Sequence, residues 1–263
     1  MHSHLKISSA RFHLWLNDPM RWIYLSPHLD DAVLSAGGLI YEQTQSGIPV
    51  EIWTFMAGDP HLGEYSPFAQ ELHGLWGFAS AEETVRARRE EDITAASILG
   101  AKTVHFDLLD CIYRRDLNGN WLYDEIAVPP READASYPAQ IAEAISNRLQ
   151  PDDRLVCQLA LGSHVDHVLV RRGAELLGHP LRYDVDVPYV LYEPQEFAAK
   201  AVGMVESIER ISEAGLTRWV EAVHAYKSQF PVLGDKFDTP KKAEDAIRNY
   251  WNERKGIRML QFG

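Results

Sequence analysis

Short apolar runs alternate with helix-like segments through the first two-thirds of the chain, and this alternation constrains the fold more than any other feature. Short apolar runs bounded by turn residues are typical of buried strands, whereas the longer segments between them suit amphipathic helices. Parallel strands need a crossover that covers one face of their sheet. The pattern therefore predicts an α/β fold with a mainly parallel sheet and helices on both faces.

Individual elements follow from apolar runs, caps and glycine stops. Strands are predicted at residues 22–25, 49–55, 103–109 and 153–159, and helices at 32–45, 82–99, 137–149 and 168–177. Residues 186–193 are predicted to form another strand, and residues 208–229 to be largely helical. We expect one domain over residues 1–263, with its core at about 20–180 and a C-terminal extension, 181–263, that shapes the pocket.

Two stretches, 61–78 and 111–130, interrupt the alternation of strands and helices and are predicted to be long loops. Loops of that length often bind ligands. The pair Gly37-Gly38 lacks the spacing of a dinucleotide fingerprint, and we expect it to allow close helix–sheet packing. The sequence assigns no role to residues 230–263, whose charged, helical character does not place them in the fold.

Composition excludes several classes of partner. The chain has 38 acidic and 26 basic residues, a net charge of −12 at pH 7, which would repel nucleic acid and anionic membranes. Two cysteines, Cys111 and Cys157, cannot form a disulfide framework, so a reduced, cytoplasmic protein is expected. Residues 1–21 lack the pattern of a signal peptide, and no run approaches the ~20 apolar residues of a membrane span.

One histidine and two acids follow the first predicted strand, in the run His28-Leu29-Asp30-Asp31. In parallel sheets, ligands bind beyond the carboxyl ends of the strands, and imidazole and carboxylate are ligands that borderline divalent metals accept. Alternatively, Asp30 or Asp31 caps the helix that follows. A cap needs only one acid, whereas a metal site accounts for the histidine and both acids.

A second polar run, His164-Val165-Asp166-His167, follows the strand predicted at 153–159. Two such loops can converge at one rim of a parallel sheet. Two histidines and one carboxylate leave coordination positions open, as in catalytic zinc sites and in non-haem iron oxygenases. The remaining residues favour hydrolysis, because an acid can act as a general base and an extra histidine can donate to an oxyanion.

With these two motifs the chain resembles the PIG-L/LmbE-like family of zinc-dependent N-acetyl deacetylases. The family's His-Pro-Asp-Asp run stands here as His28-Leu29-Asp30-Asp31, and its His-Pro-Asp-His run as His164-Val165-Asp166-His167. Leucine and valine replace the prolines, and every chemically active side chain is kept. The resemblance implies a Rossmann-like fold and hydrolysis of an N-acetyl group on a small substrate, an amino sugar or an amino-sugar conjugate.

The resemblance also implies roles for individual residues. His28, Asp31 and His167 would bind the metal, Zn²⁺ or, with the same ligands, Fe²⁺. Asp30 would be the general base for water activated by the metal. By analogy with its members, the family likeness further suggests a homo-oligomer.

The second motif would supply the other catalytic groups. His164 would stabilise the oxyanion or act as the acid, and Asp166 would orient His164. Some members carry a tyrosine two residues before the first histidine of this motif, where this chain has Gly162. Any contribution of that tyrosine must therefore come from elsewhere in the chain.

Weaker family matches point to the substrate. The helix containing Arg88 resembles the family's Arg/Glu helix, Asp110 matches an acidic position near the pocket, and residues 225–229 resemble a C-terminal segment. Arg88 could reach a substrate hydroxyl or phosphate, although arginines on such helices more commonly pair with acids along the same surface. Trp76 is a candidate to stack on a sugar ring.

Other functions remain open from the residues alone. One is a metal-dependent amidohydrolase acting on a small amide that is not a sugar. Another is a catalytically silent sugar-binding protein, which would need neither Asp30 nor His164. An iron-dependent oxygenase usually needs a jelly-roll-like scaffold, and the strand–helix alternation argues against one.

Overall fold

A seven-stranded sheet runs through the part of the chain that the computed structural model describes, residues 20–61 and 63–263. The strands are β1 (Trp22–Ser26), β2 (Val50–Thr54), β3 (Lys102–His105), β4 (Arg154–Gln158), β5 (Leu181–Asp184), β6 (Met204–Arg210) and β7 (Gly256–Phe262). Their order is β3-β2-β1-β4-β5-β7-β6. Strands β1 to β5 are parallel, and β7 runs antiparallel to both its neighbours. The segment 1–19, where no signal peptide is expected, lies outside the described residues.

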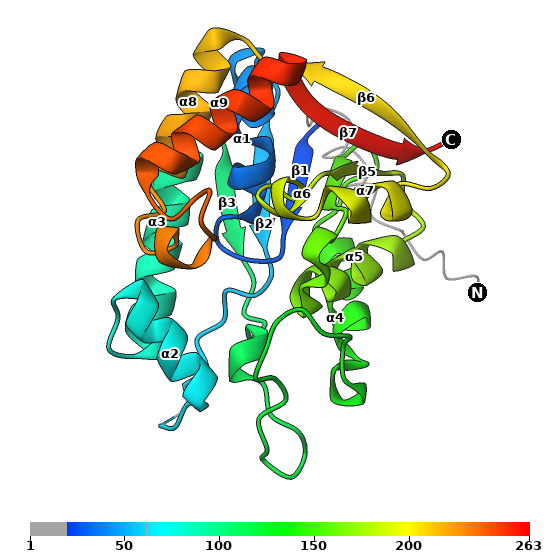
Figure 1. The fold of residues 1–263 in the computed structure, drawn as a ribbon. Coiled ribbons are helices and arrows are strands. Elements are labelled where there is room, and N and C mark those ends of the chain that lie inside the picture. The colour runs from blue at the N-terminus through cyan, green and yellow to red at the C-terminus, as the bar shows by residue number, and fades with distance from the viewer. Residues whose placement is uncertain (1–19, 62) are drawn as a thin grey trace, which may run out of the picture.

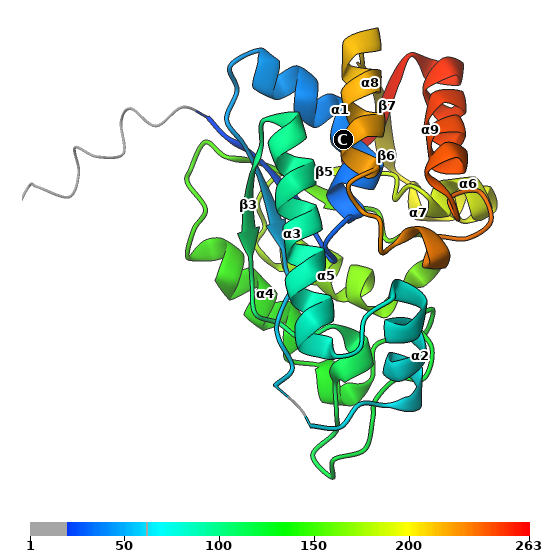
Figure 2. The ribbon, with the colours of Figure 1, turned by 90° about the vertical axis from the view of Figure 1, so that its left-hand side faces the viewer.

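Helices cover both faces of the sheet (Figures 1 and 2). One layer is made of α1 (Asp31–Gln45), α3 (Ala81–Leu99), α8 (Glu213–Val223) and α9 (Pro240–Arg254); the other is made of α4 (Tyr137–Ser146) and α5 (Val165–Leu176). The shorter helices α2 (Pro67–Trp76), α6 (Tyr189–Tyr192) and α7 (Pro194–Lys200) contribute to the cavity described below. The predicted α/β fold is confirmed.

Strand β1 lies between β2 and β4, so the strand order reverses at the boundary between β1 and β4. In open α/β sheets, the crevice for ligands forms at this point, because the loops after the two strands lead to opposite faces. The two His/Asp motifs follow β1 and β4. Topology alone therefore brings the motifs together at the carboxyl edge of the sheet.

Helix α8 packs closely on α1 because two glycines leave room for it. A Cβ on Gly37 would lie 2.5 Å from Cδ1 of Trp219, and one on Gly38 would lie 2.9 Å from Cγ2 of Ile211. The buried Trp219 donates from Nε1 to the carbonyl of Val33 at 2.8 Å. We expected the glycines to serve helix–sheet packing; the structure shows instead that they serve helix–helix packing.

The C-terminal extension departs most from the sequence prediction. Residues 186–193 are not a strand: β5 ends at Asp184, and α6 follows with main-chain bonds from Val190 to Asp186 and from Leu191 to Pro188. The helix predicted at 208–229 is β6 followed by α8. Local apolar and charged composition could not predict these states, because packing around the cavity decides the state of α6 and pairing with β7 decides that of β6.

The predicted loop 61–78 contains α2. Ser66 accepts a hydrogen bond from the main-chain nitrogen of Ala69, Pro67 opens the first turn, and Gly77 ends the helix at a φ of 82°. Residues 111–130 are mainly irregular, as predicted, apart from a 3₁₀ turn at Cys111–Tyr113. Residues 230–263, which the sequence did not place, form α9 and β7 after a short 3₁₀ turn.

The packing of α1 on α8 gives a test with an internal control. Gly37→Ala should destabilise the protein by about 1–3 kcal/mol, because the new methyl group meets Trp219 and overpacks the core. Gly74→Ala, in the last turn of α2 with open space around it, should be neutral or stabilising by up to ~1 kcal/mol through helix propensity. Urea unfolding measures both free energies. Equal effects of the two substitutions would refute the close helix contact.

Candidate metal centre and active-site cavity

The loop after β1 is shaped by the hydroxyl of Ser26. It donates to the carbonyl of His28 at 2.6 Å and accepts from the main-chain nitrogen of Ala32 at 3.1 Å, which folds the chain tightly into α1. Asp30 stands at the capping position, but its carboxylate makes no capping hydrogen bond. The capping alternative is therefore wrong for Asp30, whose buried side chain remains available to the site.

The loop after β4 adopts a left-handed backbone at Ala160, Gly162 and Ser163. Such conformations are unfavourable for residues with a Cβ and persist only where the surroundings hold them. Helix α7 supplies the restraint. Glu196 accepts from the Gly162 nitrogen at 2.6 Å and from the Ser163 hydroxyl at 2.8 Å, while Lys200 donates to the Ala160 carbonyl and to Ser163.

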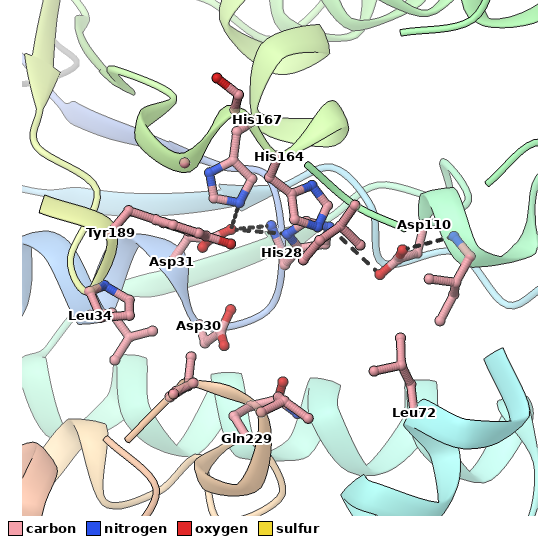
Figure 3. A pocket seen from close by; sticks show the side chains of 18 of the residues that line it. His28, Asp30, Asp31, Leu34, Leu72, Asp110, His164, His167, Tyr189 and Gln229 are labelled. Carbon is pink, nitrogen blue, oxygen red and sulfur yellow. Dashed lines mark hydrogen bonds and ion pairs between the residues drawn. The ribbon is translucent and has the colours of Figure 1, made fainter. Parts of the chain in front are cut away.

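The two loops bring His28, Asp31, His164 and His167 together in the buried floor of a cavity (Figure 3). Oδ2 of Asp31 lies 3.3 Å from Nδ1 of His28 and 3.4 Å from Nε2 of His167. Ligand atoms of a tetrahedral zinc ion are about 3.3–3.6 Å apart, given bonds of about 2.0–2.2 Å. The nitrogens of the three histidines also lie within 4.8 Å of one another. This donor set fits a divalent cation.

Carboxylates hold the far nitrogens of two of these histidines. Nε2 of His28 lies 3.1 Å from Asp166 and 3.6 Å from Asp110, and Nδ1 of His167 lies 3.4 Å from Asp186. Such partners orient metal-binding imidazoles and raise their basicity. Each imidazole thus points one nitrogen at Asp31 and the other at a buried acid.

Asp166 is itself held by a buried cation. Arg114 donates to the Asp166 carboxylate, and its Nε lies 3.3 Å from Oδ2 of Asp134. The guanidinium also stands over the ring of Tyr137, 4.6 Å from its centroid. The Asp166 carboxylate contacts His28, whereas its main-chain nitrogen donates to Nδ1 of His164 at 3.1 Å. Arg114 carried no recognisable pattern in the sequence.

Neighbouring charges separate the pKa values of the two adjacent buried acids, Asp30 and Asp31. Burial and the neighbouring Asp31 raise the pKa of Asp30 to about 7, against the opposing effect of Arg88, 3.9 Å away. Burial would also raise the pKa of Asp31, but His167 and His28 hold it well below its usual range. Neighbouring carboxylates with divergent pKa values are typical of sites that separate an acid–base group from a charged ligand.

The cavity above this floor has a volume of about 700 Å³. Its walls include apolar side chains from α1, α2 and the segment after α8, namely Leu34, Phe68, Leu72, Val232 and Leu233. Arg88 and Asp110 both line it. Arg88 is only 7% exposed and stands 4.9 Å from the ring centroid of Trp76. Its Nε has no hydrogen-bond partner among the described residues. The alternative of an ion pair on a solvated helix surface is therefore wrong for Arg88.

Tyr189 occupies the space beside Gly162. A Cβ on Gly162 would lie 2.1 Å from Cδ1 of Tyr189, so only glycine fits there. The half-buried ring of Tyr189 is 5.5 Å from that of His167 and faces the site (Figure 3). The sequence prediction missed this residue because it lies in the segment expected to be a strand.

The PIG-L family, described as GlcNAc-PI de-N-acetylase, matches residues 23–176, more than half of the chain. The chain belongs to the PIG-L family. It is thus homologous to hydrolases that remove N-acetyl groups, and both His/Asp motifs lie inside the matched region. No curated protein matches the chain.

Solved structures extend the likeness beyond the matched region. The zinc-inhibited form of teicoplanin deacetylase Orf2 is 27% identical over 92% of this chain and 97% of its own, with a TM-score of 0.79. The A40926 pseudoaglycone deacetylase Dbv21 is 30% identical over 93% and 97%, with a TM-score of 0.72. The N,N'-diacetylchitobiose deacetylase from Pyrococcus horikoshii, 17% identical over 93% and 85% with a TM-score of 0.56, shares the fold.

Among the residues that the structure describes, no helix is long and apolar enough to span a membrane.

The buried ion pairs of Arg114 with Asp166 and Asp134 lead to a prediction for the free energy of unfolding. Arg114→Met should cost about 3–5 kcal/mol of unfolding free energy, because it leaves Asp166 and Asp134 buried without their cation. Arg218→Met, which breaks only a surface pair with Glu221, should change the free energy by less than about 1 kcal/mol. Chemical denaturation distinguishes the two, and a small effect at Arg114 would contradict the assigned network.

Proposed function

We propose that this PIG-L protein is a metal-dependent hydrolase that removes the N-acetyl group from an amino sugar or an amino-sugar conjugate. One observation carries the proposal: Asp31 is shared between His28 and His167, with the raised-pKa acid Asp30 beside it, at the floor of a large cavity. Two relatives at 27% and 30% identity are deacetylases of teicoplanin and of A40926 pseudoaglycone, which favours a conjugate.

His28, Asp31 and His167 would hold the metal, and their imidazole and carboxylate atoms suit Zn²⁺ and Fe²⁺ alike. The description of one relative as zinc-inhibited favours zinc as a metal that such a site accepts. A bound cation would polarise the acetamide carbonyl and lower the pKa of a water molecule toward ~7. Asp166 and Asp186 keep His28 and His167 oriented for this purpose.

Asp30 serves as the general base that takes a proton from the attacking water. A base works best when its pKa lies near the operating pH, and burial places that of Asp30 at about 7. Arg88, 3.9 Å away, favours the charged form that the reaction needs. The absence of a capping bond leaves the carboxylate free to move a proton.

His164 serves as the donor to the developing oxyanion or as the acid for the leaving amine. Its Nδ1 accepts the main-chain N–H of Asp166, so a neutral ring carries its proton on Nε2. Burial, together with His28 and His167, lowers the pKa of His164 and favours that neutral form. A neutral imidazole with a fixed tautomer can donate to the carbonyl oxygen as negative charge develops.

Arg88 and Asp110 serve as substrate contacts. The Arg88 guanidinium lines the cavity with one nitrogen unpaired, and it can donate to a sugar hydroxyl. Asp110 lies beside His28 and can accept from another hydroxyl. A metal-dependent amidohydrolase of a non-sugar amide is the second candidate, supported by the apolar wall of the cavity, and product analysis separates the two.

Metal content and acetate release test the proposal together. The wild type should contain about one zinc or iron per chain, and His28→Ala/His167→Ala should lose it. Asp30→Ala should keep the metal but lose about 10²–10⁴-fold in the rate of acetate release from N-acetylglucosamine conjugates. His61→Ala, at an exposed histidine, is the matched control and should change neither quantity. No metal after zinc reconstitution would overturn the mechanism, and metal without acetate release would point to other amides.

The pKa of Asp30 predicts the acidic limb of the rate profile. Because the folded-state value is raised to about 7, the base becomes protonated as the pH falls through that value. Well below it, kcat/KM should therefore fall about tenfold per pH unit. Steady-state kinetics between about pH 5 and 8 measures this slope. A flat profile over that interval would remove Asp30 from the role of base.

A further inference from the structure

A second cavity adjoins the active-site cavity and has no part in the chemistry described above. It has a volume of about 520 Å³ and lies between the start of α2 and residues 116–131. Phe68 and Asp124 line both cavities, so they form the boundary between them. The second cavity is therefore next to the active-site cavity, on the side formed by these two residues.

One wall of this cavity is a braced aromatic ring. Arg115 and Trp121 pair through a main-chain bridge, and the Arg115 guanidinium stands 3.7 Å from the centroid of the indole. The turn between them is fixed by Asp116, whose carboxylate accepts from the main-chain nitrogens of Asn118 and Asn120 at 2.8 and 2.9 Å. Trp121 is thus oriented before any ligand arrives.

Two polar side chains of the same cavity have unused hydrogen-bonding capacity. Asp124 and Arg131 are exposed, and neither side chain has a hydrogen-bond or ion-pair partner among the described residues. A carboxylate can accept from two adjacent hydroxyl groups, and a guanidinium can donate to two acceptors in one plane. An aromatic platform flanked by such groups suits a ring that has both an apolar face and polar edges.

We propose that this second cavity binds a further sugar ring of the substrate, joined to the N-acetylated sugar at the metal centre. The inference rests on the proposed function and narrows its substrate class to amino sugars within an oligosaccharide or glycosylated conjugate. An acyl chain would leave Asp124 and Arg131 desolvated without partners. An anionic group would face the carboxylates of Asp116 and Asp124, and Arg131 is the one cationic side chain among the described residues that line this cavity.

Kinetics on N-acetylglucosamine and on its β-1,4-linked dimer test the subsite. The wild type should prefer the dimer in kcat/KM by about tenfold, the equivalent of about 1.4 kcal/mol. Trp121→Ala should remove this preference and leave the value for the monosaccharide within about twofold. Leu117→Ala, at a fully exposed residue on the same turn, is the matched control and should keep the preference. Equal losses on both sugars, or an unchanged preference in Trp121→Ala, would overturn the subsite.

A binding measurement separates failure of the subsite from failure of the proposed function. Calorimetry with glucosamine and its β-1,4-linked dimer needs no turnover. Tighter binding of the dimer that is lost in Trp121→Ala supports the subsite, whether or not acetate is released. If the wild type releases acetate from the monosaccharide but shows no preference for the dimer in either measurement, the hydrolase stands and the subsite falls.

Discussion

The shared carboxylate of Asp31 is the interaction on which the rest of the site depends. Burying several acids at one rim of a sheet is unfavourable unless cations or hydrogen-bond donors compensate them. Asp31 lies between two imidazoles, and the other nitrogen of each imidazole contacts a further acid, Asp166 or Asp186. A divalent cation would complete this balance, and the buried Arg114 already neutralises the acids on the outer side. Outward from Asp31, the region therefore alternates between groups of opposite kind: two imidazoles, then the acids Asp166 and Asp186, then Arg114 beside Asp166.

The first half of the fold and most of the floor of the site could be predicted from the sequence. The β1 and β4 segments are apolar runs, and each is followed by a polar motif. In a parallel sheet both motifs must lie at the same edge, the carboxyl edge. The convergence of the two His/Asp runs at that edge followed from the predicted topology, whereas the ligand set His28, Asp31 and His167 came from the resemblance to the PIG-L family. The strand order, with β1 between β2 and β4, supplies the physical reason that the two runs meet.

The C-terminal extension could not be predicted for an equally physical reason. The states of β6 and α6 depend on contacts with β7 and with the cavity, and these contacts join residues distant in sequence. The same holds for Tyr189, which is brought to the site by packing on Gly162, and for Arg114, whose partners lie 20 and 52 positions away. Residues that are placed by contacts with distant parts of the chain produce no periodic pattern in the sequence.

The hydrogen bonds from α7 to the loop of the second motif have a consequence for substitutions in the segment after β5. Glu196 and Lys200 lie beyond residues 23–176, the region that matches the PIG-L family, yet they hold the loop that presents His164 and His167. Substitutions in the segment after β5 that reshape the cavity therefore leave the second motif in place only if Glu196 and Lys200 are kept. Replacing the whole segment after β5 with another sequence would change the wall of the cavity and, unless that sequence also supplied the two anchoring side chains, would loosen the loop that carries His164 and His167. One segment of the chain thus both lines the cavity and holds the second motif in position.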